Sequence, residues 1–410
     1  MTVMARKRGQ VMVLICVSMV ALMGMIGVVA DFSFMQHQRN MMQTAADSAA
    51  LAGAQELNYG DMAAAGKADA ARNGYIDGAS SVTVTMNNPP STGPNAGSGG
   101  FVEAIVSKPE PTYCLSVIGI NTMTVSVRAV AYQGSGPNCI YVMNPSASGA
   151  MSNSGNVTVQ SSCGLLVNSS ASDGLTVNGS VTITAPTIGV VGNYTATGGA
   201  SLTPTPKTGV IAASDPLAYL QPPTVGSCAH TNFRLNGTTG SIGTPYELYA
   251  GTYCGGIGIG GNAWLHFNAG TYILAGGGLS IGSNTVMSGA SVTFYDTTGT
   301  GGYGPISING NTAVNFSAPT SGPLAGILFY QDRSIPSSAA GSSIGGNSTS
   351  TFDGTVYFPT TQVTFNGNSS TNGYSIVVAD RMVLSGNSQL GNNYSSLANG
   401  SPLKGTTLAE

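Results

Sequence analysis

Three aspartates in the C-terminal half of the chain have a spacing that could support carboxylate chemistry. Asp332, Asp353 and Asp380 are separated by 21 and 27 residues, which is close to one coil of a β-helix per step. Stacked coils could therefore carry the three carboxylates on one face. Glycoside cleavage uses such clusters, because one carboxyl group must act as an acid and another as a base or nucleophile.

The same aspartates also fit a structural role. Arg333 directly follows Asp332, and Arg381 directly follows Asp380. An adjacent guanidinium stabilises an ionised carboxylate, whereas a general acid needs a raised pKa. We therefore predict local Asp-Arg ion pairs at turns, no catalytic residues and no enzymatic activity.

Other sites for nucleophiles, metals or cofactors are poorly supported. The three histidines, His37, His230 and His266, are isolated, and no CxxC pair occurs. The glycine-rich stretch Gly255–Gly261 lacks the strand–loop–helix context of a phosphate loop and the aspartate of a calcium repeat. With a net charge of −3 and cations scattered after residue 8, the chain shows no nucleic-acid footprint. We predict no metal, no cofactor and no nucleic-acid partner.

Five of the six cysteines lie outside the apolar segment that contains Cys16. In an oxidising compartment these cysteines would form disulfides. The simplest pairing joins sequence neighbours, Cys139 with Cys163 and Cys228 with Cys254, and leaves Cys114 over. Sequence alone does not fix this connectivity.

The predicted location and topology of the protein depend on the apolar run Val11–Ala30, which contains no charge, proline or amide side chain. A helix of twenty residues spans about 30 Å, the hydrocarbon thickness of a bilayer. The residues that set the topology are charged and flank this run: Arg6, Lys7 and Arg8 before it, and Asp31 after it. By the positive-inside rule the N-terminus stays in the cytoplasm and the remainder is exported.

A cleaved signal peptide is the alternative interpretation of the same run. Val28 and Ala30 could form a small-residue cleavage site. The run is longer than the usual h-region of about 7–15 residues, so we expect it to remain as an anchor. The predicted location is the inner (cytoplasmic) membrane, with a single pass and the bulk of the chain periplasmic or extracellular.

The region after the membrane is predicted to form a small α+β unit. One helix should run to about Leu57, so that residues 1–57 form the anchor, and a second should cover Met62–Asn73. A stripe of small residues on the first helix could pack on its own domain or on a partner helix. Residues 58–133 should add a short helix within Pro111–Gly119 and three strands: Ser81–Met86, Phe101–Ser107 and Met123–Tyr132.

Residues 134–410 are rich in glycine and asparagine, and phrases such as SGN, GGN and NGN recur between short alternating strands. From Asn262 onward the steps between these asparagines are 22, 27, 36, 21 and 19 residues. Period-2 strands with corners at such intervals favour a β-solenoid, although a β-sandwich also has glycine-rich turns. The alternating apolar runs argue against disorder. Residues 195–227, with five prolines, should form an excursion with a turn of helix at Asp215–Leu220.

The N-terminal stretch combines Arg8-Gly9-Gln10, the apolar run, Asp31 and the small-residue segment Ala45–Ala54. In this combination it resembles the TadE/TadG-like proteins of Flp (tight adherence) pilus assembly. Later segments resemble the TadG-like subset without a von Willebrand domain: Cys139, Cys163-Gly164, Val167–Ser169, Gly326–Arg333 and Gly354–Pro359. The chain departs from cleaved pilins, because it lacks a glutamate at the fifth position of the apolar run.

This resemblance implies an inner-membrane protein whose exported part serves pilus assembly or adhesion, with no catalytic residues to transfer. We therefore expect a membrane-anchored structural component that displays a rigid β-domain. Its expected partners are the lipid bilayer, other pilus-assembly membrane proteins and a surface or polysaccharide ligand. The alternative is an envelope-anchored β-helix that binds or cleaves carbohydrate.

Overall fold

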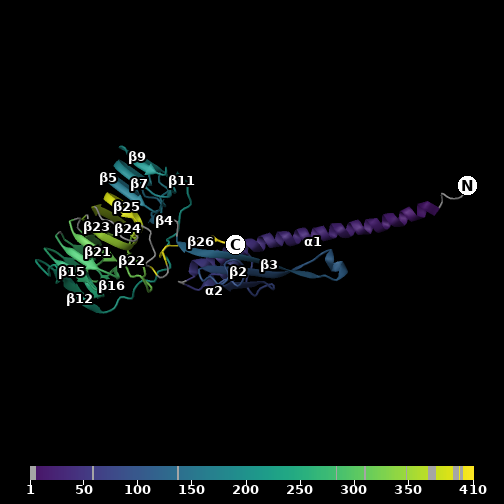
Figure 1. Cartoon of the computed structure of the whole chain (residues 1–410), viewed down its shortest axis with the longest axis horizontal. Coiled ribbons are helices and arrows are strands. Elements are labelled where there is room, and N and C mark those ends of the chain that lie inside the picture. The colour runs from purple at the N-terminus through teal and green to yellow at the C-terminus, as the bar shows by residue number, and fades with distance from the viewer. Residues whose placement is uncertain are drawn as a thin grey trace. The chain divides into compact units, whose positions relative to one another are not determined.

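The computed structural model describes residues 6–57, 60–135, 138–282, 284–308, 311–347, 349–367, 375–390, 397 and 400–410. The chain divides into two compact units, Met1–Gly134 with Lys404–Glu410, and Ser135–Leu403 (Figure 1). Within the described residues the fold is mainly β with two α-helices. Several of the recurring Gly-Asn phrases include residues outside this part, namely Ser283, Asn309, Gly310 and Asn368.

The first unit begins with a long helix, α1 (Arg6–Glu56), followed by α2 (Met62–Arg72). The start of α2 is capped by Asp61, whose Oδ1 accepts a hydrogen bond from the Ala64 backbone N–H at 2.9 Å. Such a cap satisfies an N–H group that the helix itself leaves unpaired. Both predicted helices are confirmed.

A four-stranded sheet completes the first unit in the order β1-β2-β3-β26. Its strands are β1 (Thr83–Asn87), β2 (Phe101–Pro111), β3 (Thr122–Ser135) and β26 (Lys404–Leu408), and the short helix η1 (Leu115–Ile118) lies between β2 and β3. The prediction that residues 404–410 belong to the solenoid is wrong, because these residues pair with β3. Ala409 N–H donates to Val130 O at 2.7 Å. Val130 N–H in turn donates to Glu410 O, so the free edge of β3 binds the C-terminus.

The small residues of α1 pack inside this unit. Ala45, Ala46 and Ala49 are fully buried, together with β2 residues such as Val102 and Ala104. Small side chains let the helix approach the sheet closely. The structure therefore supports packing on the helix's own domain rather than on a partner helix.

The second unit is a β-solenoid of about ten turns, as predicted. Each turn adds short parallel strands to as many as three faces. In stacking order the first face comprises β12 (Cys228–Leu235), the start of β14 (Gly251–Ile259), β16 (Gly270–Ala275), β19 (Val292–Thr297), β22 (Ile327–Gln331), the middle of β24 (Thr351–Gly367), the start of β25 (Ser375–Leu390), β4 (Asn138–Val142), β6 (Gly164–Val167), β8 (Ile188–Val190) and β11 (Lys207–Thr208).

The other two faces follow the same order. The second comprises the end of β14, β17 (Leu279–Ile281), β20 (Ile306–Ile308), β23 (Ser342–Gly346), the end of β24, the middle of β25, the starts of β5 (Met151–Ser161) and β7 (Leu175–Thr184), and β9 (Tyr194–Thr197). The third comprises β13 (Tyr246–Leu248), β15 (Trp264–Phe267), β18 (Val286–Gly289), β21 (Ala313–Ser317) and the start of β24, then the ends of β25, β5 and β7, and β10 (Ser201–Thr203).

The chain enters this solenoid in its middle. Strand β25 pairs in parallel with β4, with Val378 opposite Tyr141. From β4 the chain winds through β6 and β8 to β11, which pairs with β8. Residues 209–227, the crossing segment, then lead to β12 at the other end, and the chain winds back to β25. The solenoid therefore has two arms that meet where β25 pairs with β4.

The crossing segment is shorter than the predicted excursion at 195–227. Strands β9, β10 and β11 continue the solenoid as far as Thr208. Asp215–Leu220 forms hydrogen-bonded turns rather than a helix, with Leu220 N–H donating to Leu217 O at 3.0 Å. Pro222 and Pro223 follow after Gln221 and cannot continue a helix.

Aromatic rings fill the core of the longer arm. Tyr253, Tyr272, Phe294 and Phe329 come from successive coils and stack with ring centroids 6.0, 5.4 and 5.5 Å apart. Since parallel coils place equivalent positions above one another, like side chains stack along the axis. This stack supplies much of the apolar burial of the arm.

Glycine and asparagine occupy the corners between these strands. Gly256 has a φ of 78°, and a Cβ there would collide with the carbonyl oxygen of Gly278 on the next coil. Asn311 Nδ2 donates to Asn284 Oδ1 at 3.2 Å on the neighbouring coil. This pair is exposed, so it forms an outer contact between the corners of neighbouring coils.

Candidate functional site

The structure does not gather the three predicted aspartates into one site. Asp353 ends the part of β24 that pairs with β21 on the third face. Asp332 directly follows β22, and Asp380 lies in β25, both at the end of the first face. A corner at Gly354 separates Asp353 from that face, so the carboxylates do not converge as glycoside chemistry requires.

Hydrogen bonds hold the Asp332 carboxylate in its charged form. Its Oδ2 accepts from Thr297 Oγ1 at 2.6 Å, and its Oδ1 accepts from the Ser334 backbone N–H at 2.9 Å. Burial alone would raise the pKa of Asp332, but these donors, together with Tyr295, hold it below its ordinary value. An ionised carboxylate of this kind is a poor general acid.

One of the two predicted Asp-Arg ion pairs forms. Arg381 Nε lies 3.3 Å from Asp380 Oδ2, and Asn144 Nδ2 also donates to this carboxylate. The pairing of Arg333 with Asp332 is wrong, because Arg333 Nε lies 3.5 Å from Asp215 Oδ2 in the crossing segment. Two residues adjacent in a strand or turn need not point the same way, and Arg333 turns toward the crossing segment.

Arg333 is the centre of a clamp on the crossing segment. Its guanidinium donates to Leu220 O at 2.9 Å and to Leu217 O, and its Nε donates to Tyr357 Oη at 2.6 Å. Tyr357 Oη donates in turn to Asp215 Oδ2 at 2.5 Å. Charge-assisted bonds of this kind are the strong ones, so Arg333 has a structural role in fixing the segment against the coils.

A fourth aspartate, Asp296, was missed by the sequence reasoning. It is fully buried near the end of β19, and in the described part of the chain no hydrogen bond of standard geometry reaches either carboxylate oxygen, although the Tyr303 hydroxyl is close enough to offset part of the rise in its pKa. Burial raises its pKa well above the ordinary value. The neighbouring Gln331 donates to Tyr303 Oη and Thr361 Oγ1. The available signal was an aspartate inside the largely apolar strand VTFYDT, one residue before its end.

Two GxSxG strings, Gly278–Gly282 and Gly341–Gly345, were also overlooked. They lie in and around the strands β17 and β23 of the solenoid. A serine nucleophile of this motif needs a sharp turn between a strand and a helix. Neither string has that context, so neither indicates a hydrolase.

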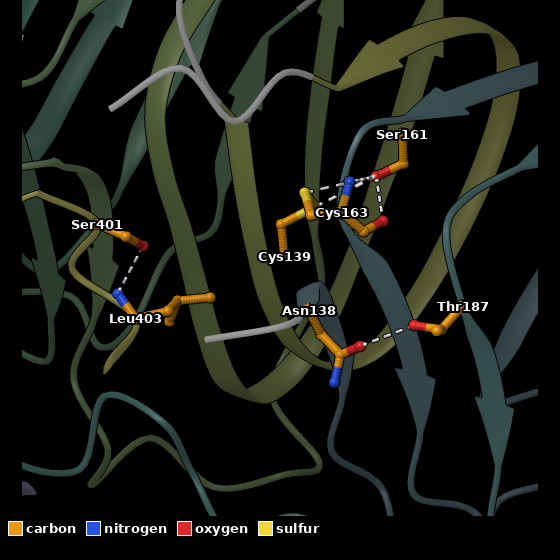
Figure 2. The surroundings of a disulfide bond; sticks show 7 residues. All are labelled: Asn138, Cys139, Ser161, Cys163, Thr187, Ser401 and Leu403. Carbon is orange, nitrogen blue, oxygen red and sulfur yellow. Dashed lines mark hydrogen bonds between the residues drawn. A yellow bond between two sulfur atoms is a disulfide. The ribbon is translucent and has the colours of Figure 1, made fainter. Parts of the chain in front are cut away.

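Both predicted disulfides are present. Cys139 bonds Cys163 and Cys228 bonds Cys254, with Cα atoms 5.6 and 5.5 Å apart. Figure 2 shows the first, with Ser161 Oγ lying 3.2 Å from the Cys139 sulfur. Each bond joins neighbouring coils of the solenoid, β4 to the start of β6 and β12 to β14.

The histidines have ordinary structural neighbours. His266 Nδ1 lies 2.9 Å from Ser288 Oγ on the next coil, and the His230 ring stacks on Tyr253. Within the residues that the structure describes, no group of three or more His, Cys, Asp and Glu side chains could hold a metal ion.

The membrane-proximal residues lie on and against α1. From Met12 to Glu56 this helix is long and apolar enough to cross a membrane, and its most apolar window is not buried by protein. Arg6, Lys7 and Arg8 are its first three residues. Asp31 is buried and accepts backbone hydrogen bonds at 3.0, 2.9 and 2.7 Å from three consecutive residues of the β2–β3 loop: Tyr113, Cys114 and Leu115.

Comparison with known proteins gives one match. Residues 9–56 match the model of a family described as putative Flp pilus-assembly TadE/G-like proteins. No curated protein and no solved structure matches the chain. The matched segment covers the apolar helix from its second turn to its last residue. The chain therefore carries a TadE/G-like Flp pilus-assembly domain, which forms its N-terminal helix.

Proposed function

We propose that this protein is a membrane-anchored structural component of Flp pilus assembly or secretion that displays a rigid β-solenoid outside the cytoplasm. The observation that carries this proposal is the coincidence of the TadE/G-like match with a helix whose most apolar window is not buried by protein. The solenoid adds a stiff stack of coils whose surface carries few charges. Such a body suits assembly or adhesion, with other pilus-assembly membrane proteins as partners.

The proposed orientation places the N-terminus in the cytoplasm and the solenoid in the periplasm or beyond. Arg6, Lys7 and Arg8 precede the apolar run, which favours their retention on the cytoplasmic side. The disulfides of the solenoid support the same orientation, because such bonds persist in oxidising compartments.

A catalytic function is not part of the proposal. The aspartates Asp332, Asp353 and Asp380 lie on two different faces, and Asp332 is held ionised by its donors. Purified protein is expected to release no reducing ends from polysaccharides. Cleavage that disappears in the Asp353→Asn variant would promote the carbohydrate alternative.

Topology is tested with single cysteines and a membrane-impermeant maleimide. Ile211 is 92% exposed in the crossing segment, so a cysteine there should react in intact spheroplasts. A cysteine at Thr2 should react only after lysis. Both variants need Cys16→Ser and Cys114→Ser, because those two thiols are free. The reverse labelling pattern would contradict the orientation.

Assembly is tested by deletion and complementation in the native cell. Loss of the chain should abolish surface Flp pili, and the full chain should restore them. A chain that lacks residues 138–403 should remain in the membrane without restoring pili. Normal piliation in the deletion strain would refute the proposed role.

A further inference from the structure

We propose that the β2–β3 loop, residues 112–121, is a second membrane contact that inserts aliphatic side chains into the lipid leaflet beside α1. The inference rests on the proposed membrane anchoring of α1 and extends it to a part of the folded unit. The partner is the hydrocarbon of the leaflet that faces the exported side.

The loop has the composition of a lipid contact. Residues 111–123 read PTYCLSVIGINTM and carry no charged side chain. Val117 is 86% exposed, Ile118 is 72% exposed and Tyr113 is 62% exposed. A cluster of large apolar side chains at one exposed tip marks an interaction site, because water is an unfavourable solvent for it. Tyrosine is enriched at the boundary between hydrocarbon and water.

The loop is held against α1 at the level where the apolar run Val11–Ala30 ends. Asp31, the first residue after the run, accepts three backbone N–H groups from the loop. A Cβ at Gly27, inside the run, would lie 2.8 Å from Cys114 Cβ, so the loop lies directly against that turn of helix. Figure 1 shows the β2–β3 hairpin extending along α1 toward its N-terminal half.

The surface beside the loop is continuous with the membrane-facing side of the helix. Val28, Val29 and Phe32 are all at least half exposed. A mostly apolar groove of about 460 Å³ lies between α1 and the hairpin. Its lining residues include Val28, Phe32, Leu115 and Met123, and also the polar side chains of Asp31, Gln36 and Arg39, which could face a lipid headgroup. An apolar groove that opens from a membrane-spanning helix fits an acyl chain of the surrounding lipid. This continuity favours lipid over a protein partner.

The test uses tryptophan fluorescence of the full chain in phospholipid vesicles, with and without brominated acyl chains as quenchers. Trp264→Phe removes the single native tryptophan, which lies in the solenoid. Val117→Trp then reports on the loop, and Leu22→Trp reports on the helix. Ile76→Trp is the matched control, since Ile76 is an aliphatic residue of the same unit that is 57% exposed but lies outside the loop.

The proposal predicts a several-fold loss of fluorescence in brominated vesicles at positions 117 and 22, and no loss at 76. Quenching at 22 but not at 117 would overturn the loop contact and leave the anchor intact. Failure to quench at 22 would overturn the anchor, and the loop contact with it. A blue-shifted but unquenched signal at 117 would indicate a protein partner or a second copy, and would also overturn the lipid contact.

Discussion

Arg333→Met should release the crossing segment from the solenoid while leaving the coils formed. Methionine keeps much of the side-chain length but removes every donor. The variant loses the bonds to Leu217 O and Leu220 O, the bond to Tyr357 Oη and the ion pair with Asp215. It also removes the cation over the rings of Tyr330 and Tyr357, which lie 5.7 and 5.2 Å from the guanidinium carbon.

The expected loss in the free energy of opening follows from these contacts. A hydrogen bond from a charged donor contributes about 1.5–3 kcal/mol, and a cation over an exposed aromatic ring about 0.5–1 kcal/mol. The Arg333 side chain is 32% exposed, so we take the lower values. The two bonds to main-chain carbonyls alone then give about 3 kcal/mol. That corresponds to roughly 100-fold more frequent opening.

Hydrogen exchange of peptides from the crossing segment measures this opening. Amides such as Leu220 N–H, which bonds to Leu217 O, should exchange roughly 100-fold faster in the variant, by the same conversion of free energy. Arg381→Met is the matched control, because it removes an ion pair of an exposed arginine without touching the segment. An increase below about threefold in Arg333→Met, or an equal increase in the control, would refute the assigned role.

Three further predictions concern stability. Asp296→Asn should remove a pH dependence of the unfolding free energy. Since the pKa of Asp296 is raised in the folded state, the wild type loses stability as the pH rises through that pKa, by up to about 1.4 kcal/mol per pH unit. Urea unfolding at several pH values should therefore show a flatter profile in the variant. Burial alone would raise the pKa of Glu103, but Arg128 and three further donors lower it to about 2. The ionised Glu103 therefore contributes to the unfolding free energy above its unfolded pKa of 4.5, and this contribution is lost as the pH falls toward 2. Glu103→Gln should lower the unfolding free energy by about 3 kcal/mol at pH 7 and make it depend less on pH in the acid range. An unchanged midpoint of acid unfolding would contradict the pairing of Glu103 with Arg128. Replacing Cys228 and Cys254 by serine should lower the unfolding free energy by about 2–4 kcal/mol, measured against wild type under non-reducing conditions. The control compares reduced wild type with the reduced variant, which should differ little because both then lack this bond and the bond from Cys139 to Cys163.

The local patterns of the sequence predicted most of the elements. The alternation in Trp264–Phe267 and Ala313–Phe316 belongs to single strands, so it can be read without knowing their neighbours. The stacking order could not be predicted in this way. Strand β25 pairs with β4 from the opposite end of the unit, and the glycine-asparagine corners of all coils look alike. No local signal distinguishes the true neighbour from any other coil.

The same limit applies to the side chains. Adjacency suggested that Arg333 pairs with Asp332, whereas its partner Asp215 comes from the distant crossing segment. Asp296 has no charged neighbour in sequence, and its burial follows only from the coils stacked on both sides of it. The disulfides were easier to predict, because each joins successive coils and therefore residues close in the chain.

The two-arm path explains where those disulfides lie. Strand β12 begins the longer arm and has one neighbouring coil, so its residues are mostly exposed and its burial contributes little. The bond from Cys228 to Cys254 fastens this terminal coil to β14. Strand β4 begins the other arm, and its second neighbour, β25, lies more than 230 residues later in the chain. The bond from Cys139 to Cys163 can hold β4 on β6 before β25 arrives, so each disulfide secures the first coil of an arm, where parallel pairing alone is incomplete.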